Sequence, residues 1–136
     1  MIIRKIALLF MSLASFSQSP VGAWERFYEN ENGTEIRSVV IFSEKFQSIA
    51  MFNAKSGEFI YSNGGTWELD GNMMTEVVEF DTANSERVGN VVTFEVNITN
   101  DKLSIPESDW HFSRIDDGKP GDLNGAWLMS GRYRNG

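Results

Sequence analysis

The sequence predicts an all-β protein that folds as an antiparallel up-and-down β-barrel of about eight strands. Three observations lead to this prediction. Apolar and polar residues alternate with a period of two, short turn signals separate the alternating segments, and no window shows a sustained helical period. A two-sheet β-sandwich is the alternative architecture, because it is built from the same short strands and turns.

The strands follow one another along most of the chain. The clearest is 92–98, where Val92, Phe94 and Val96 share one face and polar residues occupy the other. In the segment 74–80, Glu76 lies on the apolar face. Pairs such as Asn-Gly at 32–33 tolerate positive φ and separate the strands as tight turns. The other strands are expected at 24–28, 36–42, 46–52, 65–69, 110–114 and 123–133.

The first 17 residues have the pattern of an export signal. Arg4 and Lys5 precede the short apolar stretch 6–14, and small residues at 15 and 17 predict cleavage before Gln18. The apolar stretch is shorter than the roughly 20 residues that span a bilayer. We therefore expect a secreted or periplasmic protein with no membrane association after cleavage, and an uncleaved anchor is the alternative.

Charge and cysteine content exclude several classes of function. The chain has 19 acidic and 12 basic residues, a net charge of −7, so it lacks the clustered cations that nucleic acids and anionic membranes attract. It has no cysteine, which excludes a lipid-anchored lipoprotein, a disulfide scaffold and a cysteine nucleophile. Stability must come from an ordinary apolar core.

The tripeptide Gly-Ala-Trp occurs twice, at 22–24 and at 125–127. A glycine two residues before a tryptophan lets the chain turn in tightly, so that the Trp24 indole plugs one end of the barrel. We expect a barrel domain over 18–116 and a Gly/Pro-rich linker over 117–122. The segment 123–136 then either supplies the strand that closes this barrel or begins a truncated second repeat.

These motifs resemble a known group of proteins. Gly-Ala-Trp at 22–24 resembles the Gly-x-Trp motif that opens lipocalin-type barrels, the calycin group. The segments 46–50, 64–67, 74–80 and 86–89 resemble lipocalin-like domains of uncharacterised bacterial secreted proteins, which often occur in tandem. The resemblance implies a barrel around a cavity. It also implies that Arg114, on the closing strand, packs over Trp24.

A barrel of this size has room inside for side chains or for one small ligand. Two charged residues, Arg26 and Glu76, fall at inward positions, where a charge is costly unless it is paired. We expect them either to approach one another or to line a polar cavity; an internal ion pair or a Glu76 side chain at the rim is the structural alternative. The candidate ligand-binding residues are Arg26, Tyr28, Trp67, Met74, Glu76 and Phe94.

Catalysis and metal binding have little support. His111 is the only histidine, and its alternation with Trp110 and Phe112 places it toward solvent. The sequence predicts no enzyme activity, no cofactor and no metal site. The predicted function is non-catalytic binding of a small, largely apolar ligand inside the barrel. The alternative is a ligand-free interaction module of a tandem-repeat protein, with Phe27, Ile49 and Met51 on a contact face; the sequence does not indicate an oligomeric state.

Overall fold

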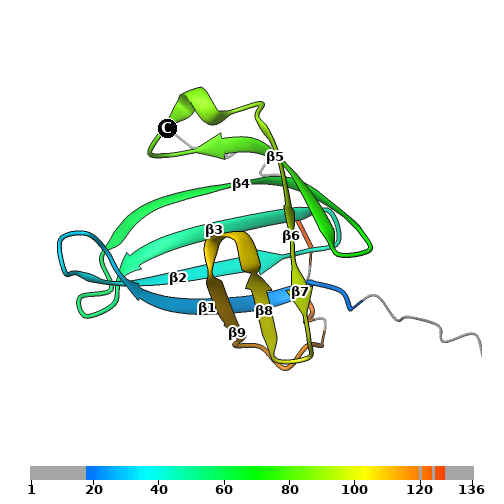
Figure 1. The fold of residues 1–136 in the computed structure, drawn as a ribbon, viewed down its shortest axis with the longest axis horizontal. Helices are drawn as coiled ribbons and strands as arrows, with labels where there is room; N and C mark the ends of the chain where they lie inside the picture. The colour runs from blue at the N-terminus through cyan, green and yellow to red at the C-terminus, as the bar shows by residue number, and fades with distance from the viewer. Residues whose placement is uncertain (1–17, 120, 124, 128–136) are drawn as a thin grey trace, which may run out of the picture.

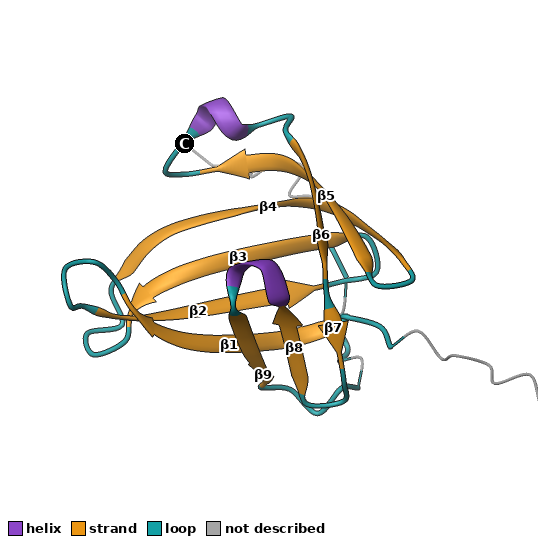
Figure 2. Cartoon of the chain, in the orientation of Figure 1, coloured by secondary structure: helices purple, strands orange, loops and turns teal. Residues whose placement is uncertain are grey.

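The computed structural model describes residues 18–119, 121–123 and 125–127, and these form a nearly closed antiparallel β-barrel (Figure 1). The predicted all-β, up-and-down barrel is therefore confirmed, and the sandwich is not formed. Two single-turn 3-10 helices, η1 (Ser85–Arg87) and η2 (Pro106–Ser108), connect strands (Figure 2). The strands are β1 (Gly22–Glu29), β2 (Glu35–Phe42), β3 (Phe46–Asn53), β4 (Phe59–Asp70), β5 (Met73–Asp81), β6 (Val91–Glu95), β7 (Asn97–Ile98), β8 (Lys102–Ile105) and β9 (Trp110–Arg114).

The strands pair in the order β6-β5-β4-β3-β2-β1-β9-β8-β7. The two edge strands, β6 and β7, are separated by Val96 alone, so the backbone itself joins the two edges of the sheet. The predicted strand 92–98 is thus one bent segment that pairs with β5 in its first part and with β8 in its last. Figure 1 shows this segment crossing in front of the long strands β1 to β4. Because closure hides the sheet edges, little unpaired backbone remains for aggregation.

The long strand β4 carries two adjacent glycines at its bend. Gly64 pairs with Phe80 and Gly65 with Val78, so one β5 residue bulges between them. A Cβ on Gly65 would overlap the Val77 carbonyl oxygen and lie 2.8 Å from the Glu79 amide nitrogen. The absence of side chains here therefore allows β4 and β5 to approach closely as the sheet curves.

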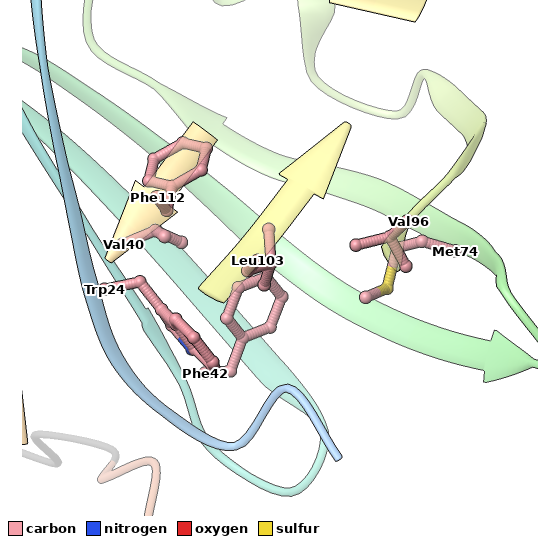
Figure 3. Packing of buried hydrophobic residues seen from close by; sticks show 7 residues of the cluster. All are labelled: Trp24, Val40, Phe42, Met74, Val96, Leu103 and Phe112. Atoms are coloured by element: carbon pink, nitrogen blue, oxygen red, sulfur yellow. The ribbon is translucent and has the colours of Figure 1, made fainter. Parts of the chain in front are cut away.

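Seven buried apolar side chains pack together inside the barrel as its core (Figure 3). Trp24 and Met74 are completely buried, and the edge of the Phe42 ring meets Trp67 at a centroid distance of 5.7 Å. The Trp24 Nε1–H donates a hydrogen bond to the Pro20 carbonyl, 2.7 Å away, so the polar atom of the buried indole is satisfied. The buried cluster consists of Trp24, Val40, Phe42, Met74, Val96, Leu103 and Phe112.

Arg114 covers the outer side of the Trp24 plug. Its guanidinium carbon lies 4.0 Å from the centre of the indole ring, and Nη1 donates to the Val21 carbonyl and to Asp116 Oδ1, both at 3.1 Å. This is the packing that the resemblance to lipocalin-type barrels implies. Gly22 has a φ of +132°, and a Cβ there would lie against Arg114 Nη1 and 2.8 Å from Asp116 Oδ2. The glycine of the motif is thus required both by its backbone angle and by the arginine beside it.

The second Gly-Ala-Trp repeats the local geometry of the first. Gly125 has a φ of +127°, and the Trp127 Nε1–H donates to the carbonyl of Leu123, four residues earlier, at 3.1 Å. Unlike Trp24, Trp127 is 75% exposed. The barrel is closed by β9, which pairs with β1, and the described residues of 123–127 are not in a strand. The predicted signal sequence 1–17 and residues 128–136, which include most of the predicted last strand, lie outside the described residues.

Candidate functional site

A cavity of about 340 Å³ lies in the barrel interior. Its volume lies at the lower end of the roughly 300–1,000 Å³ that is typical of small-molecule sites. Most of its wall is apolar and comes from β2, β3, β5 and β6, with Val40, Ile49, Met51, Val78 and Phe94 as examples. The polar lining residues come from β3 to β6 and from the two short helices: Gln47, Tyr61, Asn63, Glu76, Arg87, Thr93, Glu107 and Ser108. An apolar wall with a few convergent polar groups is the usual composition of a ligand pocket.

Glu76 is the carboxylate on the inner face of β5. It stands between the buried residues Met74 and Val78, and its Oε2 accepts a hydrogen bond from Gln47 Nε2 at 3.1 Å. Burial raises the pKa of Glu76 from its ordinary value of 4.5 to about 7, although the positive charge of Arg87 and the Gln47 hydrogen bond both act to lower it. The carboxyl group therefore changes charge close to neutral pH.

Arg87 reaches the cavity from η1 and is held by Asp81 at the end of β5. Arg87 Nη1 lies 2.7 Å from Asp81 Oδ2, and the Asp81 side chain is only 1% exposed. Oδ1 of Asp81 also accepts the backbone N–H groups of Ala83 and Asn84, each at 2.9 Å. These backbone hydrogen bonds, with that of Asn84 the largest cause, and the Arg87 charge hold the pKa of Asp81 below its usual range. The connection between β5 and β6 is thereby fixed beside the cavity.

The raised pKa of Glu76 predicts a stability that falls between pH 4.5 and pH 7. The folded protein holds the Glu76 proton more tightly than the unfolded chain, so ionisation of this group favours unfolding. Its contribution is fully present below pH 4.5, is lost as the pH rises through about 7, and is constant above that. Glu76→Gln is expected to raise the free energy of unfolding at pH 8 by about 1–3 kcal/mol and to leave it nearly unchanged at pH 4.5.

Urea denaturation at the two pH values measures this difference. Glu79→Gln is the matched control, because Glu79 is exposed on the outer face of the same strand. An equal effect of the two substitutions at pH 8 would contradict the assignment to the buried carboxyl group.

Arg26 is held by aromatic rings. Its guanidinium carbon lies 4.3 Å from the ring centre of Tyr28, 4.4 Å from that of Trp110 and 5.8 Å from that of Phe112. Burial lowers the pKa of Arg26. Arg26 does not line the main cavity, and no ion pair joins it to Glu76 in the described part of the chain. Of the two inward charges, Glu76 lines a partly polar cavity as expected, whereas Arg26 is stabilised by cation–π contacts.

The structure brings three of the six candidate ligand-binding residues together. Met74, Glu76 and Phe94 line the cavity. Tyr28 lies beneath Arg26. Trp67 is half-buried outside the cavity wall and donates from Nε1 to the Ser43 carbonyl at 3.0 Å. Trp67 therefore supports the packing around Phe42 rather than the cavity.

The expected contact face was wrong in two of its three positions. Ile49 and Met51 line the cavity, whereas Phe27 is 54% exposed. Segment 46–52 is apolar on both faces, so its alternation alone does not say which face is inside. The inward set of β3 includes Gln47, which is 7% exposed, and sequence reasoning missed it. The sequence signal for the inward position of Gln47 is that it alternates with the same period as Ile49 and Met51, so the three side chains share one face of the strand.

The single histidine of the chain does not line the cavity. His111 faces outward, with 68% of its side chain exposed, and its Nε2 lies 2.9 Å from Asp109 Oδ1. No group of three or more potential metal-ligating side chains occurs within the described residues. Over the same part of the chain, no helix has the length and apolar character needed to cross a membrane.

Comparisons with protein-family models, with curated proteins and with solved structures find no match to this chain. The antiparallel, nearly closed barrel is consistent with a lipocalin-like fold.

Proposed function

We propose that this chain is an exported lipocalin-like domain that binds a small, largely apolar molecule inside its barrel without transforming it. The observation that supports this function is the cavity of about 340 Å³ with its mainly apolar wall. Water in such a space gains few hydrogen bonds, so an apolar ligand that displaces it is favoured. The export signal expected at 1–17 and the resemblance of the sequence motifs to bacterial secreted lipocalin-like domains support the compartment and the family.

Two neighbouring valines allow a direct test of the binding site. Val92 lines the cavity, whereas Val91 is 64% exposed and points the other way along β6. A neutral apolar fluorophore, N-phenyl-1-naphthylamine, is expected to gain fluorescence with the wild-type protein. Val92→Phe fills part of the cavity and is expected to weaken binding by about tenfold or more, since rejecting an oversized group costs on the order of 1–3 kcal/mol.

Val91→Phe, the same change on the outer face, is expected to bind like the wild-type protein. Absence of binding by the wild-type protein would contradict the proposed function. So would equal weakening by the two variants, because it would place the probe on the surface or report a general loss of structure.

A second candidate function is an interaction module of a tandem-repeat protein. The observation that favours it is the repeated geometry of Gly125 and Trp127, with an indole that is formed like the Trp24 plug but is exposed. An exposed tryptophan of this kind is suited to contact with another protein unit. Self-association that is lost in Trp127→Ala, without loss of the fold, would favour this second function.

A further inference from the structure

One carboxylate oxygen of Glu76 is available to a ligand. Oε2 accepts from Gln47 Nε2, and the described residues provide no hydrogen bond to Oε1. No buried side-chain oxygen or nitrogen in this part of the chain lacks a partner, so Oε1 is not sealed inside the wall. Glu76 lines the cavity, and Oε1 is therefore the acceptor that a molecule in the cavity can reach.

The charge of Arg87 acts on Glu76, but no ion pair joins the two residues in the described part of the chain. Arg87 is the cation among the lining residues, and its Nη1 is already paired with Asp81 at 2.7 Å. Glu107, at the start of η2, adds a second carboxylate to the lining. Tyr61, on β4, adds no charge, because its phenol is neutral near pH 7 and burial raises its pKa further. With Glu76 ionised, the charged groups that line the cavity leave a net negative field.

Arg26, the cation of β1, does not itself line the cavity. The rings of Tyr28 and of the cavity-lining Trp110 lie against its guanidinium group. A carboxylate ligand in the cavity would meet two other carboxylates, those of Glu76 and Glu107. The arginine that lines the cavity, Arg87, already has its Nη1 paired with Asp81. A ligand with a positive charge would meet an acceptor that has no competing cation bound to it.

We propose that the cavity selects an apolar amine, with its ammonium group donating to Glu76 and its hydrocarbon part against Val40, Ile49 and Phe94. This inference rests on the proposed binding function. A charge-assisted hydrogen bond in a partly desolvated site is stronger than one between neutral groups, so the head group decides among ligands with the same apolar part. A fatty acid of equal length is rejected by like-charge repulsion.

Three probes with the same eight-carbon chain isolate the head group: octylamine, octanol and octanoate. Displacement of N-phenyl-1-naphthylamine at pH 8 is expected to show octylamine binding at least about tenfold more tightly than octanol, with octanoate weakest. At pH 5.5 Glu76 is protonated, while the alkylammonium group keeps its charge. The preference for octylamine over octanol is expected to fall several-fold at that pH.

Two variants assign the effect to one carboxyl group. Glu76→Gln is expected to lose the preference for octylamine and to keep octanol binding, whereas Glu79→Gln, on the outer face of β5, is expected to retain both. His111 is exposed on the outer face, so His111→Gln is expected to leave the pH dependence unchanged.

The outcomes separate this inference from the proposed function. If the fluorophore and octanol bind but octylamine is not preferred, the amine selectivity is wrong and the apolar binding function stands. If octanoate binds most tightly, or if Glu76→Gln keeps the full preference for octylamine, the inference is overturned. If none of the probes binds, both proposals fail. The pH comparison uses the wild-type protein and so remains decisive even if Glu76→Gln does not fold.

Discussion

Replacing Trp24 by alanine is expected to lower the free energy of unfolding by about 3–5 kcal/mol, the largest effect of any side-chain truncation in this barrel. Trp24 is completely buried, donates a hydrogen bond to Pro20 at 2.7 Å and carries the guanidinium group of Arg114 on its outer face. Truncation leaves a cavity and removes the hydrogen bond to the Pro20 carbonyl. It also removes the ring against which the Arg114 guanidinium group packs. Because small domains are stable by only about 5–15 kcal/mol, much of the protein is expected to unfold near 40 °C.

The chain contains its own control for this substitution. Trp127 lies in the same tripeptide with the same local geometry, but it is 75% exposed. Trp127→Ala is therefore expected to change the free energy of unfolding by less than about 0.5 kcal/mol. Trp24→Phe keeps much of the apolar volume and is expected to fall between the two. Urea denaturation followed by circular dichroism measures all three variants, and equal effects at positions 24 and 127 would contradict the role of Trp24 as the plug.

Replacing Gly65 by alanine is expected to cost more than about 2 kcal/mol, even though it adds a single methyl group. The new Cβ would overlap the Val77 carbonyl oxygen and lie 2.8 Å from the Glu79 amide nitrogen, which are backbone atoms of β5. Backbone atoms in a ladder cannot move aside as a side-chain end can, so the bulge between β4 and β5 must shift or open.

Gly121→Ala is the matched control for the Gly65 substitution. A Cβ at Gly121 would meet no atom within 4 Å, and the same change is expected to be neutral or slightly stabilising. Thermal unfolding monitored at 218 nm compares the two variants. A Gly65→Ala protein as stable as Gly121→Ala would show that β4 and β5 do not approach as closely as the bulge requires.

The fold could be predicted because its determinants are local. Alternation in 92–98 and in 74–78 predicted strands with the correct inward faces, whereas Phe80, beyond the bulge, is 39% exposed. The tight turns at positions such as Gly33 and Gly71 have the positive φ that their sequences favour. The first Gly-Ala-Trp predicted that Trp24 is buried as a plug, because a glycine at the start of a strand lets the chain turn tightly enough for the indole to pack inside. These features depend on residues near one another along the chain.

The cavity could be predicted only in part, because it depends on register and on charges far apart in sequence. The segment 46–52 is apolar on both faces, so its own sequence does not determine which face points inward. The pairing of β3 with β2 and β4 determines it. Arg87 sits in a short helix between strands, where no alternation indicates its direction. Arg26 was correctly expected to need compensation, but the compensation comes from aromatic rings on β1 and β9 rather than from Glu76.

Methyl NMR of the labelled protein, titrated with octanol, tests whether a small apolar molecule binds inside the barrel. Ile49 and Val78 line the cavity, whereas Ile41 and Val91 are 55% and 64% exposed on the outside. We expect saturable shifts of the Ile49 and Val78 methyl signals, with those of Ile41 and Val91 unchanged. Shifts confined to Ile41 and Val91, or no saturable shift at any of the four, would contradict binding inside the barrel.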